Sequence, residues 1–248
     1  MYWSEGRGST RLPAGPAPGP KARAATMTER LGPRFQTSDV LRMFPSFLWK
    51  AELRPDVYEP INDLILRTLG EIGAPLADLD VGESWQSEQG LHERGPFRAI
   101  VDCINEATES VLDYLKVDHE GSRITGCWAN VSAPGAGHRA HSHPNNFLSG
   151  VYYLQTQQGA DTINFHDPRP QTGIIRPPAR ELTAENADQV VVKVKDGALL
   201  LFPAWLQHSV DPNRSARARI SLGFNIMFAA YAERIARPMW EGGRRPEV

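Results

Sequence analysis

The sequence predicts an α+β domain that is mainly β, with helices packed on one side of an antiparallel sheet or barrel. Two stretches with helical spacing of apolar residues come first, at 57–72 and 96–117. From residue 122 onward the pattern changes to short apolar runs punctuated by Gly, Pro, Asn and Asp, which is typical of strands. The 248 residues suffice for one sizeable core. Helices followed by a run of strands indicate this fold class.

The individual elements are expected in a definite order. The stretch 40–53 predicts a first strand that is interrupted at Pro45. The helix over 57–72 follows from its apolar stripe, and the helix over 96–117 begins at Pro96, a residue that suits a first helical turn. Strands are then expected in the runs RITGCWANV, SGVYYLQT, TINFHD, VVVKV, ALLLFPA and ARISLGFNIMF.

Composition bounds the class of protein. A formal net charge of -2 gives no electrostatic case for nucleic acid or an anionic membrane. No apolar run approaches the length of a membrane span, and the N-terminus lacks the apolar core of a secretory signal. Cys103 and Cys127 are expected to be buried, reduced thiols. We therefore expect a cytoplasmic protein.

The chain is expected to comprise a tail and one domain. Residues 1–34 are rich in proline and glycine and poor in long apolar residues, so a disordered tail is expected there. Met27 could begin the native protein, which leaves open whether residues 1–26 belong to it. Residues 35–248 are expected to form a single domain.

Three histidines and one arginine carry the functional signal. His141 and His143 are two residues apart, so on a strand they would point to the same face, and His208 follows in LFPAWLQHSVDPN. Converging neutral imidazoles are a common way to hold a transition metal. Arg219 and Ser221 would place a guanidinium and a hydroxyl on one strand face, a pair that suits a carboxylate. Metal site and carboxylate anchor together predict an iron oxygenase that uses 2-oxoglutarate.

The order of these residues resembles the double-stranded β-helix oxygenases that use Fe(II) and 2-oxoglutarate, over about residues 41–228. The chain is similar to a bacterial group with a tryptophan-asparagine strand, an HxHP segment and SGVYYL, here at 128–130, 141–144 and 149–154. WQSEQGLH at 85–92 also matches. More distantly it resembles the prolyl hydroxylases. The resemblance implies a jelly-roll, cupin-like fold with the N-terminal helices packed on one sheet.

The resemblance also implies roles for individual residues. His141, His143 and His208 would bind Fe(II), leaving positions for 2-oxoglutarate and dioxygen. Arg219 and Ser221 would hold the far carboxylate of 2-oxoglutarate, with Tyr153 matching a tyrosine that contacts it in prolyl hydroxylases. The candidate substrate contacts are Trp85, Asn130, Arg169 and Asn225. Trp85 could equally cap the barrel, and Arg169 could equally be a surface residue.

One position departs from the superfamily pattern. Two histidines and a carboxylate usually bind the iron, and His143 stands where the carboxylate is expected. We expect a three-histidine site, while Asp161 or Asp167 as a ligand stays open. The alternative is a three-histidine metal protein of cupin type (thiol-dioxygenase-like, hydrolase or non-catalytic) that does not use 2-oxoglutarate.

The expected reaction is hydroxylation of an unactivated C–H bond. The substrate could be a small metabolite or a peptide side chain. The oligomeric state is open, with a homodimer as one option.

Overall fold

The computed structural model describes residues 36–232, except 38, 42, 171–173 and 176. The chain divides into two compact units, Met1–Pro45 and Ser46–Val248. The tail expected over residues 1–34 lies outside the described residues. The fold and the site below concern the second unit.

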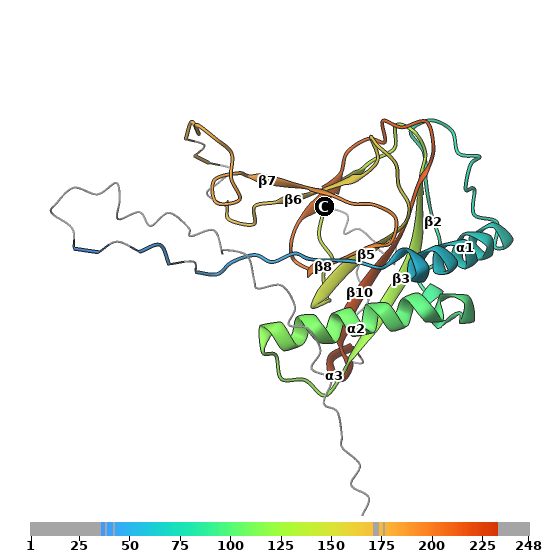
Figure 1. The fold of residues 1–248 in the computed structure, drawn as a ribbon, viewed down its shortest axis with the longest axis horizontal. Coiled ribbons are helices and arrows are strands. Elements are labelled where there is room, and N and C mark those ends of the chain that lie inside the picture. The colour runs from blue at the N-terminus through green and yellow to red at the C-terminus, as the bar shows by residue number, and fades with distance from the viewer. Residues whose placement is uncertain (1–35, 38, 42, 171–173, 176, 233–248) are drawn as a thin grey trace, which may run out of the picture. The chain divides into compact units, whose positions relative to one another are not determined.

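The described part of this unit contains two antiparallel sheets (Figure 1). The larger has the strand order β1-β8-β5-β10-β3-β2, and the smaller has the order β4-β9-β6-β7. From β3 onward the chain passes back and forth between the sheets, with β6 and β7 following each other in the smaller one: β3, β5, β8 and β10 lie in the larger sheet, while β4, β6, β7 and β9 lie in the smaller. This alternation is the winding of a double-stranded β-helix, so the expected fold is confirmed.

The strands of the larger sheet are β1 (Trp49–Glu52), β2 (Ser84–Gln86), β3 (Ser122–Ser132), β5 (Leu148–Gln155), β8 (Ala198–Pro203) and β10 (Arg219–Phe228). Those of the smaller sheet are β4 (His138–His141), β6 (Thr162–His166), β7 (Gln189–Lys193) and β9 (His208–Val210).

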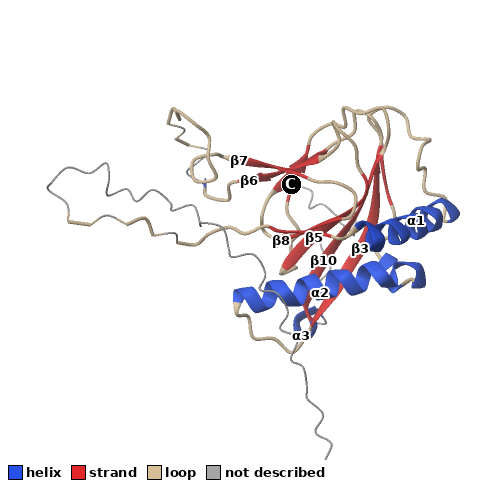
Figure 2. Ribbon diagram, viewed as in Figure 1, coloured by secondary structure: helices blue, strands red, loops and turns tan. Residues whose placement is uncertain are grey.

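Two long helices cover the outer face of the larger sheet (Figure 2). They are α1 (Pro55–Glu71) and α2 (Arg98–Leu115), and both were predicted to within a few residues. Pro96 lies in the short 3-10 helix η3 (Gly95–Phe97) that leads into α2. The α2 helix ends where Lys116 takes a left-handed conformation, with φ 56°. The remaining short elements are η2 (Leu91–Glu93) and α3 (Ala229–Ala232).

Two apolar clusters hold these layers together. In the first, Ile65 and Ile104 of the helices pack with Leu222 and Phe224 of β10. In the second, residues such as Phe165 and Phe202 fill the space between the sheets. Because strand residues alternate between faces, the even-numbered residues of β10 face the helices and its odd-numbered residues face inward. Each buried large side chain stabilises the fold by about 1.5–3 kcal/mol.

The structure corrects two expectations about strands. Of the stretch 40–53, only Trp49–Glu52 forms a strand among the described residues. His141 and His143 were expected on one strand, but β4 ends at His141. Pro144 lacks the N–H that a further ladder bond would need, and the His143 N–H donates to the carbonyl of Ala204 at 2.8 Å instead. The short strands β2 and β9 were not expected.

In the described part of the chain, no helix has the length and apolar character that crossing a membrane requires.

Candidate metal centre

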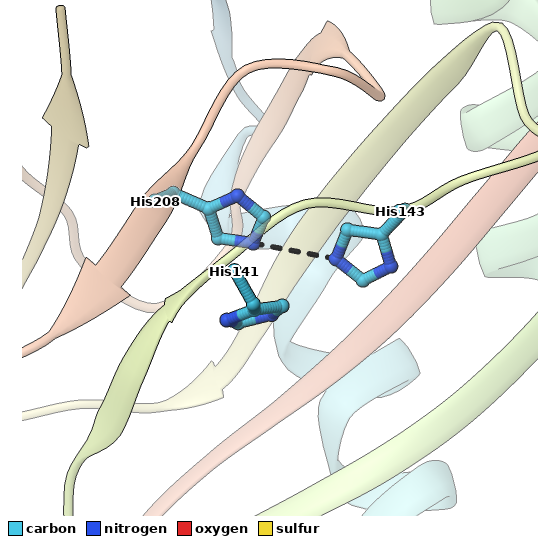
Figure 3. Close-up of side chains that lie close together, drawn as sticks. All are labelled: His141, His143 and His208. Carbon is cyan, nitrogen blue, oxygen red and sulfur yellow. Dashed lines mark hydrogen bonds between the residues drawn. The ribbon is translucent and has the colours of Figure 1, made fainter. Parts of the chain in front are cut away.

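Three histidines, from the end of β4, the segment after it and the start of β9, lie close together (Figure 3). His141 ends β4, His208 begins β9, and the β4–β9 register places their Cα atoms opposite each other. His143 lies in the segment after β4. One ring nitrogen from each histidine lies within 4.8 Å of the others, and the Nε2 atoms of His143 and His208 are 3.3 Å apart. The group is thus compact enough to share one metal ion.

Backbone carbonyls orient two of the three rings. The Nδ1 of His141 lies 2.8 Å from the carbonyl oxygen of Arg139, and the Nδ1 of His208 lies 3.1 Å from that of Leu206. A carbonyl can only accept, so each Nδ1 carries the proton. The Nε2 lone pairs of both rings are therefore free, as in histidines that ligate metals.

Burial favours the uncharged form of two of these imidazoles, those of His143 and His208. Burial lowers the pKa of His143 to about 4, and the nearby His141 contributes. Burial lowers the pKa of His208 to about 3, against the opposing effect of its hydrogen bond to Leu206. A neutral imidazole is the form that binds a metal. Lone pairs of His143 and His208 that face each other repel unless a proton or a cation lies between them, so the set fits a divalent first-row metal.

The two carboxylates considered as ligands lie outside this group. Asp167 accepts hydrogen bonds from Arg169, at 2.9 Å from its Nε. Asp161 accepts a hydrogen bond from the backbone N–H of Gly159 at 3.1 Å. Among the described residues, the metal-ligand group consists of the three histidines alone.

The histidines line a cavity of about 820 Å³ between the sheets. Its floor includes Arg219, Ser221, Gly223 and Asn225, the inward-facing residues of β10. A volume of this size accommodates a small-molecule ligand.

Arg219 is a buried cation in this cavity, with 5% of its surface exposed. Its guanidinium donates to the carbonyl of Thr162 at 3.2 Å and to the Tyr153 hydroxyl at 3.4 Å, and lies 5.1 Å from the centroid of the Tyr153 ring. No carboxylate of the described residues forms an ion pair with it. A buried charge without a counter-ion is costly, so this position suits an anionic ligand.

Trp128 contacts one of the three histidines directly. Its ring stacks on His143 at a centroid distance of 5.8 Å and an interplanar angle of 29°. A Cβ atom on Gly223 would lie 2.7 Å from the Trp128 ring, so only glycine leaves room for it. The sequence signal for this contact was a glycine in mid-strand, which often marks a close approach of another group.

One family model matches the part of the chain that contains the three histidines. Residues 126–225 match the family model described as "Putative 2OG-Fe(II) oxygenase". That segment contains all three histidines and Arg219. Over this segment the chain is similar to the 2OG-Fe(II) oxygenase family. The description of that family names Fe(II) and 2-oxoglutarate, which are the cofactors predicted for this chain.

Solved structures share the fold of this chain at low sequence identity. The non-haem α-ketoglutarate-dependent carbocyclase SnoK from nogalamycin biosynthesis is 14% identical, with 74% of this chain and 80% of that chain covered and a TM-score of 0.54. A Pseudomonas putida prolyl-4-hydroxylase is 15% identical, with 74% and 93% covered and a TM-score of 0.52. HygX from Streptomyces hygroscopicus, with nickel and 2-oxoglutarate bound, is 12% identical, with 74% and 83% covered and a TM-score of 0.51. Among curated proteins, none matches the sequence.

The fold brings some of the predicted substrate residues to the cavity. Asn130 and Asn225 line it. Trp85 instead packs against the apolar cluster under the helices, and its neighbour Gln86 lines the cavity. Arg169 is exposed and pairs with Asp167.

Several lining residues did not stand out in the sequence. They include Gln86, Gln89, Ser132 and Asn146, and His138 lines the cavity beside them. Burial, with Arg219 and His141 nearby, lowers the pKa of His138 to about 4. Most of these residues belong to short strands or loops, where no periodic pattern marks the inward face.

Proposed function

We propose that this oxygenase binds Fe(II) through His141, His143 and His208 and hydroxylates an unactivated C–H bond with 2-oxoglutarate and dioxygen. One observation carries the proposal: a compact group of three histidines and a buried arginine without an acidic partner among the described residues line the same cavity. When bound, the iron and 2-oxoglutarate supply the oxidising chemistry. The protein supplies position, orientation and shelter from water.

Arg219 is the proposed anchor for the far carboxylate of 2-oxoglutarate. Its guanidinium can grip a carboxylate through two parallel hydrogen bonds. Ser221 lies on the same face of β10 and offers a hydroxyl donor. Tyr153 accepts a hydrogen bond from Arg219 and lies against its guanidinium, so it would orient the arginine toward the ligand.

Substrate contacts are proposed for Asn130 and Asn225, which line the cavity. We do not assign contacts to Trp85 or Arg169, since neither lines it. The substrate is proposed to be a small molecule or a peptide side chain. A cytoplasmic location is part of the proposal, and the free thiols of Cys103 and Cys127 fit a reducing compartment.

The test is succinate production from 2-oxoglutarate by the purified protein. Iron is added without oxygen, and dioxygen is then admitted. We expect slow succinate formation that requires Fe(II), 2-oxoglutarate and dioxygen together, even without the substrate. The same protein loaded with Zn(II) is the matched control, because zinc has no redox chemistry. Succinate levels no higher with iron than with zinc would contradict the proposal.

The second candidate is a three-histidine metal protein of cupin type that does not use 2-oxoglutarate. It is favoured by one observation, the lack of a carboxylate in the metal-ligand group of the described residues. It predicts tight zinc binding and no change in metal properties when 2-oxoglutarate is added.

A further inference from the structure

The cavity floor has two sides, which the Trp128–Gly223 pair separates. Arg219 lies on one side along β10 and Asn225 on the other. A strand rises about 3.3 Å per residue, so these two residues are about 20 Å apart along β10. The four carbon–carbon bonds of 2-oxoglutarate, about 1.5 Å each, span at most about 6 Å. If the proposed function is right and Arg219 holds 2-oxoglutarate, the Asn225 side is left for the substrate.

The Asn225 side of the cavity is lined by the side-chain amides of Gln89, Asn146 and Asn225. The Ser149 hydroxyl donates to Oδ1 of Asn225 at 2.7 Å, which leaves the amide N–H groups of Asn225 without a partner among the described residues. Both polar ends of Asn146 are used, by the Thr125 hydroxyl at 2.6 Å and the Pro144 carbonyl at 3.0 Å. Asn225 therefore presents donors to the cavity, where they need an acceptor on the ligand.

Gln89 completes this side and is held in place by β3. Its backbone carbonyl accepts a hydrogen bond from the Cys127 N–H at 2.7 Å, and Gly90 forms an isolated bridge with Cys127. Its side chain lies over Gly126, where an added Cβ would be 3.2 Å from Oε1. In the described structure its amide has no hydrogen-bond partner, so it offers both a donor and an acceptor.

The charged side chains that line the cavity are all positive. They are Arg139 and Arg219, and no Asp or Glu of the described residues lines the cavity. An ammonium group brought here would lose its water without gaining an anion, which is costly. An uncharged amide or hydroxyl would exchange its water for matched hydrogen bonds.

We propose that the Asn225 side of the cavity binds an uncharged amide or hydroxyl group of the substrate, through Gln89 and Asn225, and excludes cationic substrates. This inference names the substrate class for the proposed function and rests on it.

The experiment uses small probes of different charge rather than the unidentified substrate. The protein is loaded with Co(II) and saturated with 2-oxoglutarate. Paramagnetic relaxation of methyl protons is then measured for N-methylacetamide, methylammonium and methanesulfonate, with the Zn(II) protein as the diamagnetic reference. We expect the strongest relaxation for N-methylacetamide. An equal or stronger effect for either charged probe, or no effect above the bulk level for any probe, overturns the inference.

Variants of Gln89 test the assigned residue. Losing one hydrogen bond in Gln89→Leu should weaken the N-methylacetamide effect by roughly threefold to tenfold. The isosteric Gln89→Glu should admit methylammonium, since it adds the missing carboxylate. Gln189→Leu is the matched control, because Gln189 is exposed on β7 and does not line the cavity, and it should leave the N-methylacetamide effect unchanged. Equal effects in Gln89→Leu and wild type overturn the assignment.

The same samples separate the two levels of the account. Absorption spectra recorded before the probes are added report cobalt and 2-oxoglutarate binding. Failure of either binding step refutes the proposed function, and this inference falls with it. Normal binding with no discrimination among probes refutes this inference alone.

Discussion

His208 is the histidine on which metal retention should depend most. It is 4% exposed and its ring is oriented by the Leu206 carbonyl. We expect His208→Ala to lose the bound metal on gel filtration, because two ligands make a weak site. His166→Ala is the control: His166 bonds Ser209 but is not part of the metal-ligand group, so its metal content should match wild type. Both are measured by elemental analysis, and wild-type metal content in His208→Ala would exclude this histidine as a ligand.

Arg219 should determine the affinity for 2-oxoglutarate and leave iron content unchanged. Truncating one partner of a sheltered charge pair costs about 2–5 kcal/mol. Arg219→Ala should therefore raise the 2-oxoglutarate dissociation constant by roughly thirtyfold or more. Arg219→Lys should recover only part of the loss, since an ammonium is a point charge and not a fork. The measurement is anaerobic titration of the Fe(II) protein, followed by its metal-to-ligand charge-transfer band. Unchanged affinity in Arg219→Ala would favour the cupin-type alternative.

At the scale of the strands, β10 and β3 together position the metal site through Gly223 and Trp128. In Gly223→Ala the new methyl group would press on the Trp128 ring, which stacks on His143. Overpacking of this kind costs about 1–3 kcal/mol. We expect lower stability to denaturant together with weaker metal binding. Gly95→Ala is the control, because an added Cβ there meets no atom within 4 Å. Wild-type metal affinity in Gly223→Ala would show that His143 does not depend on this contact.

Two adjacent tyrosines of β5 should separate stability from ligand binding. The Tyr152 hydroxyl donates to Oδ1 of Asn62 in α1 at 2.7 Å, and Asn62 donates to the Leu154 carbonyl at 2.9 Å. Tyr152→Phe leaves the buried Asn62 oxygen unpaired, at a cost of about 1–3 kcal/mol, and should not alter 2-oxoglutarate affinity. Tyr153→Phe removes the acceptor beside Arg219 and should weaken 2-oxoglutarate binding. Denaturant unfolding and the same titration measure both variants, and the reverse pattern would contradict the assigned faces.

The long elements could be predicted from sequence, while the short ones could not. The helices α1 and α2 and the six strands predicted after residue 122 are long enough for a pattern of apolar residues to be recognised. The strands β4 and β9 have four and three residues, too few for a pattern. The convergence of His141, His143 and His208 was anticipated, although the reason given was partly wrong. A turn after β4, and not a continuous strand, brings His143 to the site.

At the scale of the whole molecule, metal binding should stabilise a domain that already folds without it. The two apolar clusters contain none of the three histidines. A ligand at about a hundred times its dissociation constant adds about 2.7 kcal/mol. For a domain of this size that corresponds to a rise in Tm of roughly 5–10 °C. Thermal unfolding with excess Ni(II), compared with the chelator-treated protein, measures this rise. The His208→Ala variant should show none, and an equal rise there would place the metal elsewhere.

The residues that line the cavity beside the metal site were the hardest part of the structure to predict from sequence. Arg219 and Ser221 stood out because they alternate on one long strand. Gln89 did not, because its position depends on how the loop after β2 closes over β3. Trp85 shows the converse: a tryptophan in a polar stretch suggested a ligand contact, but parity on β2 turns it toward the core and leaves Gln86 facing the cavity.

The most direct measurement is an anomalous difference map from crystals grown without oxygen with Fe(II) and 2-oxoglutarate. The account predicts one iron peak about 2.0–2.3 Å from a ring nitrogen of each of His141, His143 and His208, the usual range for imidazole nitrogen on such metals. It also predicts the far carboxylate of 2-oxoglutarate on the guanidinium of Arg219. A peak away from His143, a carboxylate ligand from Asp161 or Asp167, or 2-oxoglutarate bound away from Arg219 would contradict it.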